Sequence, residues 1–271
     1  MTLKNFNYAF ITGAAGLLGP IHAEALAEKN VNLILVDINK KKLDKIQANL
    51  KKKFRNIKIL KEVVDITNEK KIESLFKKLK NLKIKVKYLI NNAENNPKML
   101  SLSSNKLSNI QNYTAKKLRE EIDVGIIGTF ICSKYFSKFL DKKNNGIIIN
   151  ISSDLGINAP DQRVYHKSRN INLVKQFKPI SYSISKHAII GITKYLATLF
   201  ASKNIRCNTL SLGPVLNNQP KFLIRNQSNK IPLNRWANKY EYKKAIQFLS
   251  DENNSYMTGQ NLIIDGGKTI W

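Results

Sequence analysis

Tyr182 and Lys186 are the residues of this chain whose types and spacing most directly indicate acid–base chemistry. Residues four apart on a helix share a face, so the lysine ammonium can lie beneath the phenol. A nearby cation favours the phenolate and lowers a phenol pKa of roughly 10, which lets a tyrosine exchange a proton with a substrate. Ser153 could donate a hydrogen bond to a substrate oxygen as charge develops there. A tyrosine and a lysine at this spacing are more often ordinary neighbours, so the hypothesis depends on the surrounding elements.

Those elements alternate between short apolar runs and segments with helical periodicity. The runs predict buried strands at residues 8–12, 31–36, 57–64, 86–90, 146–151, 205–210 and 261–264. Helices are predicted from near residue 16, over 72–79, and at about 115–140 and 182–202. Apolar strands bounded by helices imply a parallel sheet covered on both faces, and right-handed crossovers give a doubly wound topology. We expect an α/β fold with one Rossmann-type sheet of about seven strands, in a single domain over residues 1–271.

A glycine-rich turn falls where the first strand gives way to the first helix, which is the context that dinucleotide binding requires. Gly13 permits the tight turn, Gly16 lets the backbone approach a pyrophosphate, and Gly19 allows close packing of helix on strand. The helix N-terminus adds partial positive charge. The alternative is an ordinary glycine-rich turn between a strand and a helix.

Asp37 closes the second predicted strand. A carboxylate there can accept hydrogen bonds from the adenosine ribose and repel a 2′-phosphate, so we expect NAD in preference to NADP. The basic run at residues 40–42 softens this expectation, because it could hold the extra phosphate.

Seven markers, in order along almost the whole chain, resemble those of the short-chain dehydrogenase/reductase family. They are the glycine turn, Asp65-Ile66, Asn91-Asn92-Ala93-Glu94, the strand that ends in Ser153, Tyr182-x-x-x-Lys186, Leu212-Gly213-Pro214-Val215 and Asp265-Gly266-Gly267. The resemblance implies an NAD(P)-dependent oxidoreductase in which Ser153, Tyr182 and Lys186 are catalytic. The cofactor-binding residues it implies are Gly13, Gly16, Leu18, Gly19, Asp37, Asp65, Ile66, Asn92, Ala93, Tyr182, Lys186, Pro214 and Val215.

Four positions depart from the family pattern. Gly16 falls one place earlier than the common spacing, Glu94 replaces a glycine, and Leu212 replaces a proline. The fourth is Gly125, where the family usually has an asparagine that supports a water chain behind the lysine. Either another group holds that water, or proton transfer is slower, or activity is lost. We expect that activity survives because the three catalytic candidates are intact, and the alternative is a non-catalytic dinucleotide-binding regulatory protein.

An insertion at about residues 154–181 separates Ser153 from Tyr182 and is expected to select the substrate. Its charged residues, whose arginines could clamp a phosphate or carboxylate, are Asp161, Arg163, His166, Lys167 and Arg169. A solvated loop is the equal alternative. Segments 155–161, 194–197 and 216–220 resemble a branch of flagellin-modification or surface-sugar dehydrogenases. That resemblance implies an acidic sugar derivative, phosphorylated or nucleotide-linked, as substrate.

The net charge of +27 raises the possibility of a nucleic-acid partner. However, 39 of the 46 basic residues are lysine, and they are spread along the chain rather than forming an arginine-rich surface, so we expect none. The two cysteines, Cys132 and Cys207, lie in apolar stretches and predict neither a disulfide framework nor a metal site. No apolar run approaches the roughly 20 residues that span a bilayer, so a cytoplasmic protein without membrane contact is expected. The resemblance further implies a homodimer or homotetramer built on the two long helices.

Overall fold

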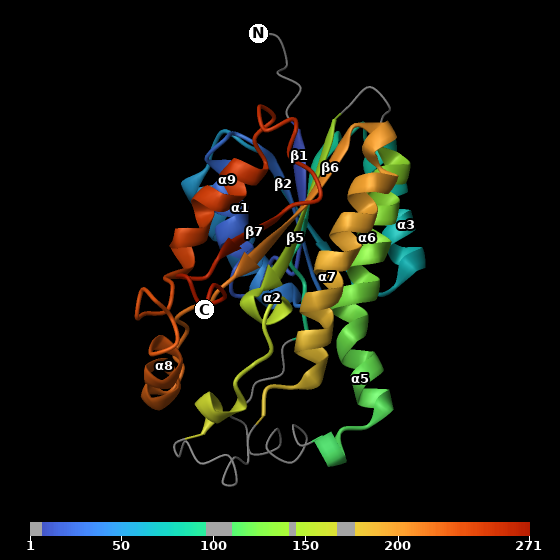
Figure 1. Cartoon of the computed structure of the whole chain (residues 1–271). Helices are drawn as coiled ribbons and strands as arrows, with labels where there is room; N and C mark the ends of the chain where they lie inside the picture. The colour runs from blue at the N-terminus through green and yellow to red at the C-terminus, as the bar shows by residue number, and fades with distance from the viewer. Residues whose placement is uncertain (1–6, 96–109, 141–144, 167–176) are drawn as a thin grey trace.

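The computed structural model describes residues 7–95, 110–140, 145–166 and 177–271. Within these ranges seven parallel strands form one sheet in the order β3-β2-β1-β4-β5-β6-β7 (Figure 1). The strands are β1 (Tyr8–Thr12), β2 (Asn32–Asp37), β3 (Ile59–Val63), β4 (Val86–Asn91), β5 (Gly146–Ser153), β6 (Ile205–Leu212) and β7 (Asn261–Ile264). The order reverses between β1 and β4, so the predicted doubly wound, Rossmann-type sheet is confirmed.

Helices cover both faces of this sheet (Figure 1). One face packs against α1 (Gly19–Ala27), α2 (Lys40–Lys53) and α9 (Lys243–Leu249). The other packs against α3 (Glu69–Asn81), α6 (Gly128–Phe139) and α7 (Ile180–Leu199). Two further helices, α5 (Ala115–Ile122) and α8 (Lys221–Ser228), extend beyond the sheet at its lower end in Figure 1.

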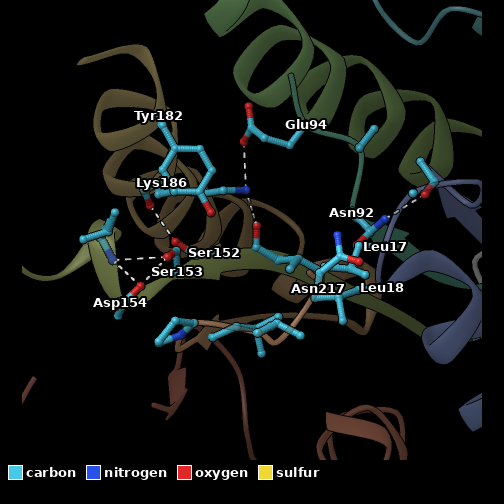
Figure 2. Close-up of a pocket in the computed structure, with 18 of the residues that line it drawn as sticks. Leu17, Leu18, Asn92, Glu94, Ser152, Ser153, Asp154, Tyr182, Lys186 and Asn217 are labelled. Atoms are coloured by element: carbon cyan, nitrogen blue, oxygen red, sulfur yellow. Dashed lines mark hydrogen bonds and ion pairs between the residues drawn. The ribbon is translucent and has the colours of Figure 1, made fainter. Parts of the chain in front are cut away.

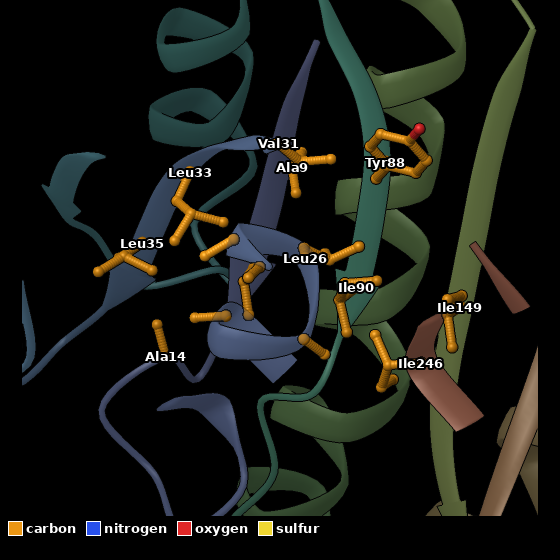
Figure 3. Packing of buried hydrophobic residues seen from close by; sticks show 14 of the residues in the cluster. Ala9, Ala14, Leu26, Val31, Leu33, Leu35, Tyr88, Ile90, Ile149 and Ile246 are labelled. Atoms are coloured by element: carbon orange, nitrogen blue, oxygen red, sulfur yellow. The ribbon is translucent and has the colours of Figure 1, made fainter. Parts of the chain in front are cut away.

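The strands are apolar on both sides because each contributes to two cores. In β1, Ala9 and Ile11 point into one hydrophobic cluster, while Tyr8 and Phe10 point into the other. Figure 3 shows the first cluster, in which Leu26 of α1 packs among side chains of the central strands. Continuous apolar runs are what a sheet covered on both faces requires, and this is why the strands could be placed from the sequence.

Two helices differ from their predicted extent. The first begins at Gly19 rather than near residue 16, because residues 13–18 form the turn that precedes it. The segment predicted as one helix over 115–140 is α5 and α6 joined by a π-helical turn, Asp123–Ile127. Such turns are single-turn insertions that often occur at functional sites, and this one contains Gly125.

Gly19 brings α1 close to the first turn. A Cβ atom at this position would lie 2.5 Å from the Gly13 carbonyl oxygen and 2.6 Å from Ala14 Cα, which are both backbone atoms and have little freedom to move. We expect Gly19→Ala to reduce the free energy of unfolding by about 1–3 kcal/mol, the usual cost of overpacking, as measured by denaturant unfolding.

Gly191→Ala is the matched control for that change. Gly191 lies within α7, and a Cβ there would meet no atom within 4 Å. Within one chain alanine favours a helix by up to about 1 kcal/mol over glycine, so this variant should be as stable as wild type or more stable when both are measured as monomers. Equal stability of the two variants would contradict the close packing at Gly19.

Candidate active site

A cleft of about 950 Å³ lies at the carboxyl ends of the strands. Six of the seven strands, β1 to β6, contribute lining residues at or just after their last residue: Gly13, Asp37, Asp65, Asn92, Ser153 and Gly213. Ligands in open α/β sheets bind at this edge, near the point where the strand order reverses. The cleft is also within the range of known ligand sites, roughly 300–1,000 Å³.

Nearly all of the predicted cofactor-binding residues line this cleft. They are Gly13, Gly16, Leu18, Asp37, Asp65, Ile66, Asn92, Ala93, Tyr182, Lys186, Pro214 and Val215. Gly19 is the exception, since it is buried under the turn and packs against backbone there. The buried position of Gly19 agrees with its predicted role, which is close packing of the helix on the strand, and not with direct contact to a ligand.

The glycine turn is held in shape by contacts to β2 and β4. Gly13 has a φ of +60°, which glycine adopts readily, and a Cβ there would lie 2.7 Å from Ala93 Cα. The Asn92 side-chain amide donates to the Gly13 carbonyl at 3.0 Å. Asp37 accepts hydrogen bonds from the Ala15 amide at 2.9 Å and the Asn39 amide at 2.8 Å. The carboxylate is therefore fixed beside the turn.

The three catalytic candidates also meet in the cleft. Ser153 is the last residue of β5, and Tyr182 and Lys186 lie on the first turns of α7 (Figure 2). Lys186 Nζ lies 5.5 Å from the centre of the Tyr182 ring and donates a hydrogen bond to the Ile151 carbonyl at 3.1 Å. The predicted placement of the ammonium beside the phenol is therefore present.

The prediction that this ammonium leaves the phenol with a lowered pKa is wrong for the chain alone. Burial raises the pKa of Tyr182, and the carboxylates of Glu94 and Asp154 raise it further. Lys186 and a hydrogen bond with Ser153 act in the predicted, lowering direction but do not outweigh burial. Burial also opposes the charge on Lys186, yet Glu94 and Tyr182 together keep the pKa of Lys186 above its usual value. The lysine therefore stays an ammonium.

Four charged residues at the site were not predicted as part of it: Glu94, Asp154, Lys178 and Lys268. Asp154 is buried, accepts a hydrogen bond from Ser153 Oγ at 2.6 Å and pairs with Lys268. Lys178 lines the cleft, and its ammonium lies 3.8 Å from the centre of the Tyr182 ring. Burial lowers the pKa of Lys178 to about 8. Asp154 could have been found as the neighbour of Ser153, whereas nothing in the spacing indicates Lys268.

Glu94 fills the position behind the lysine. Its Oε2 lies 2.8 Å from Lys186 Nζ, and both side chains are almost completely buried, with exposed fractions of 9% and 5%. The structure thus places another charged group beside the lysine, and whether a group holds the predicted water there stays a prediction. The missing side chain at Gly125 is therefore a weaker reason to expect a non-catalytic protein.

Arg163, one of the two arginines of the predicted clamp, does not line the cleft. Both Nε and Nη2 of Arg163 donate to the Asp161 carboxylate at 2.9 Å, and Lys230 pairs with the same carboxylate. Arg163 lines a separate, smaller depression. Lys167 and Arg169 lie outside the described residues. Within the described part of the predicted insertion, Lys178 is the residue that places a cation near Tyr182, in addition to Lys186 of α7.

Two other kinds of site are absent from the described ranges. In them no helix is long and apolar enough to cross a membrane, and no group of three His, Cys, Asp or Glu residues could hold a metal ion. Cys132 and Cys207 are buried free thiols.

Comparison with known proteins identifies the family. A family model described as enoyl-(acyl carrier protein) reductase matches residues 13–269. The chain belongs to the short-chain dehydrogenase/reductase family. It is an oxidoreductase that uses a nicotinamide cofactor.

Three relatives illustrate the likeness. A 3-oxoacyl-(acyl-carrier-protein) reductase of Thermotoga maritima is 28% identical, over 96% of each chain. A post-translational flagellin modification protein A of Campylobacter coli is 25% identical, over 95% of this chain and 96% of its own. A crystal structure of a short-chain dehydrogenase from Leptospira borgpetersenii with bound NAD+ is 30% identical, with a TM-score of 0.82 over 99% of this chain and 97% of that one. The likeness therefore extends over the whole sheet and its helices.

Proposed function

We propose that this protein catalyses hydride transfer between NAD and a hydroxyl or carbonyl group of a small, negatively charged substrate, such as a phosphorylated or nucleotide-linked sugar of surface-glycan biosynthesis. The observation that carries the proposal is the meeting of Ser153, Tyr182 and Lys186 in the same cleft as the glycine turn and Asp37. Asp37 ends β2 and Ser153 ends β5, so a ligand along the cleft would cross the sheet from one to the other.

The roles of the three residues follow from their surroundings. When bound, the nicotinamide would supply or accept the hydride. Tyr182 would exchange a proton with the substrate oxygen, and the positive charge of Lys186 would favour the phenolate. Ser153, whose hydroxyl now donates to Asp154, would donate to the substrate oxygen as negative charge develops on it.

The preference for NAD rests on Asp37. Its carboxylate is held by two backbone amides at the end of β2, where it would face the adenosine ribose and repel a 2′-phosphate. The first lysine of the neighbouring basic run, Lys40, pairs with Asp44 at 2.8 Å within α2. That pairing leaves less reason to expect Lys40 to hold the extra phosphate. The NAD+ in the Leptospira relative is consistent with this preference.

A negatively charged substrate is favoured by Lys178. This side chain lines the cleft beside the Tyr182 ring, and its pKa of about 8 leaves it mainly protonated at pH 7. The flagellin modification relative agrees with the resemblance to flagellin-modification dehydrogenases, from which we infer a sugar as the class of substrate. We place the selection of substrate at this end of the cleft rather than at Arg163.

Assembly into a homodimer or homotetramer is part of the proposal. The outer surfaces of the π-helical turn, α6 and α7 carry large apolar side chains that are exposed in the isolated chain: Ile127, Phe130, Tyr195 and Leu199. A second copy of the chain would cover them, since exposed apolar side chains that gather on one surface commonly mark interfaces.

Tyr182→Phe tests the proposed reaction. Sugar phosphates, nucleotide sugars and uncharged alcohols would be screened anaerobically with NAD, and the reduced cofactor followed by absorbance. We expect at least one anionic sugar to support turnover and the variant to lose about 10²- to 10⁴-fold in kcat, the usual contribution of a general acid or base. Cofactor binding without turnover on any substrate would favour the regulatory alternative, and turnover of simple alcohols alone would contradict the anionic substrate.

Asp37→Asn tests the cofactor preference. The asparagine keeps one of the two acceptor oxygens that hold the turn and removes the charge, so the ratio of kcat/KM with NAD to that with NADP should fall about tenfold or more, roughly 1.4 kcal/mol. Asp251→Asn is the matched control, because it makes the same change of net charge at a residue that pairs with Lys29 outside the cleft. It should leave the ratio unchanged. A wild-type protein that prefers NADPH would contradict this part.

Lys178→Met tests the charge of the substrate. The variant should raise KM for an anionic substrate about tenfold and leave KM for an uncharged alcohol nearly unchanged. Because the Lys178 cation is present below its pKa of about 8 and lost above it, the wild-type KM for the anion should rise as pH passes 8. The variant should lack that rise. Lys230→Met, whose lysine pairs with Asp161 outside the cleft, should behave as wild type.

A further inference from the structure

The Glu94 carboxylate occupies the space that a side chain at Gly125 would fill. Glu94 follows β4 and reaches toward Lys186, as Figure 2 shows, so that Oε2 lies 2.8 Å from Nζ. Gly125 lies in the π-helical turn on the other side of that carboxylate. A Cβ atom at position 125 would lie 2.7 Å from Oε1 and 2.8 Å from Oε2 of Glu94. A side chain at 125 and the carboxylate in its present position are therefore mutually exclusive.

The two residues are also departures from the family pattern, which has a glycine in place of Glu94 and an asparagine in place of Gly125. A large polar side chain has thus been lost from the helical turn and another gained after β4. In this structure both changes meet at the ammonium of Lys186. The geometry links the two changes, because the Glu94 carboxylate can take its present position only where residue 125 has no side chain.

We propose that Glu94 is a positioning residue for the reaction, which holds the Lys186 ammonium in place from the side opposite the Ile151 carbonyl. This inference rests on the function proposed above. Lys186 Nζ is fixed by two oxygens, that of Ile151 at 3.1 Å and that of Glu94 at 2.8 Å. Among the described residues the Glu94 oxygens are buried and have no hydrogen-bond partner of regular geometry, so the ion pair is the contact that orients this carboxylate.

The charge of Glu94 gives the proposal a measurable signature. The charged and titratable groups that act on Tyr182 are Lys186, Glu94, Asp154, Lys178 and Tyr165. Of these, Glu94 raises the pKa of Tyr182 and also the pKa of Lys186. Removal of its charge should lower both pKa values. Since alcohol oxidation needs the phenolate, its rate should then rise at a lower pH.

A stability cycle tests the exchange without any assay of activity. Gly125→Ala forces the Glu94 carboxylate away from Lys186, so it should lower the Tm in the wild-type background. In a Glu94→Gly background the same alanine meets no carboxylate and should leave the Tm unchanged or raise it, because alanine favours the helix. Gly191→Ala, in open space on α7, should have the same effect in both backgrounds. Identical effects of Gly125→Ala in the two backgrounds would overturn the exchange.

Kinetics test the positioning role. We expect Glu94→Gly to lower kcat about tenfold or more, and Gly125→Asn in that background to recover most of the loss. Glu94→Gln should keep the fold and shift the rising limb of the pH–kcat profile to lower pH, which a merely structural role would not do. Wild-type kcat and pH profile in both Glu94 variants, with Tyr182→Phe inactive, would overturn this inference and leave the proposed function intact. Absence of turnover in the wild type would instead remove the proposed function, and with it the positioning role.

Discussion

A buried ammonium is the constraint on which this site depends. Burial of an unpaired charge costs several kcal/mol, so Lys186 can lie inside the protein only where oxygens surround its Nζ. The Ile151 carbonyl comes from β5 and the carboxylate of Glu94 from the segment after β4, while the lysine itself is on α7. Three elements must therefore meet within hydrogen-bonding distance. The parallel sheet achieves this because neighbouring strands end at the same edge.

The same edge explains how the residues proposed for proton transfer and those proposed for cofactor recognition come to share a cleft. The end of β2 supplies Asp37, the turn after β1 supplies backbone amides, and the end of β5 supplies Ser153. The two hydrophobic cores behind the strands fix their relative positions, and the glycine turn is tied to β2 and β4 by hydrogen bonds. The specificity of the site is thus set by side chains and loops, while the sheet provides rigidity.

The sequence was sufficient for the sheet and for the three central residues, because both are encoded locally. Strands buried on two faces are continuous apolar runs, and Tyr182 and Lys186 are neighbours on one helix. Contacts between distant segments leave no local pattern: nothing in the sequence indicates that Glu94 meets Gly125 or that Asp154 pairs with Lys268. The prediction of a lowered pKa for Tyr182 is wrong for a similar reason, since the degree of burial depends on the whole fold.

An ammonium held by a carboxylate lies beside the Tyr182 ring, in the cleft that we propose for a nucleotide. A crystal structure of the protein with bound NAD is the sharpest test of this arrangement. We expect Glu94 within hydrogen-bonding distance of Lys186 Nζ, and the Tyr182 hydroxyl facing the nicotinamide end of the cofactor. A Glu94 side chain turned away from the lysine, with the cofactor in place and water beside Nζ, would contradict it.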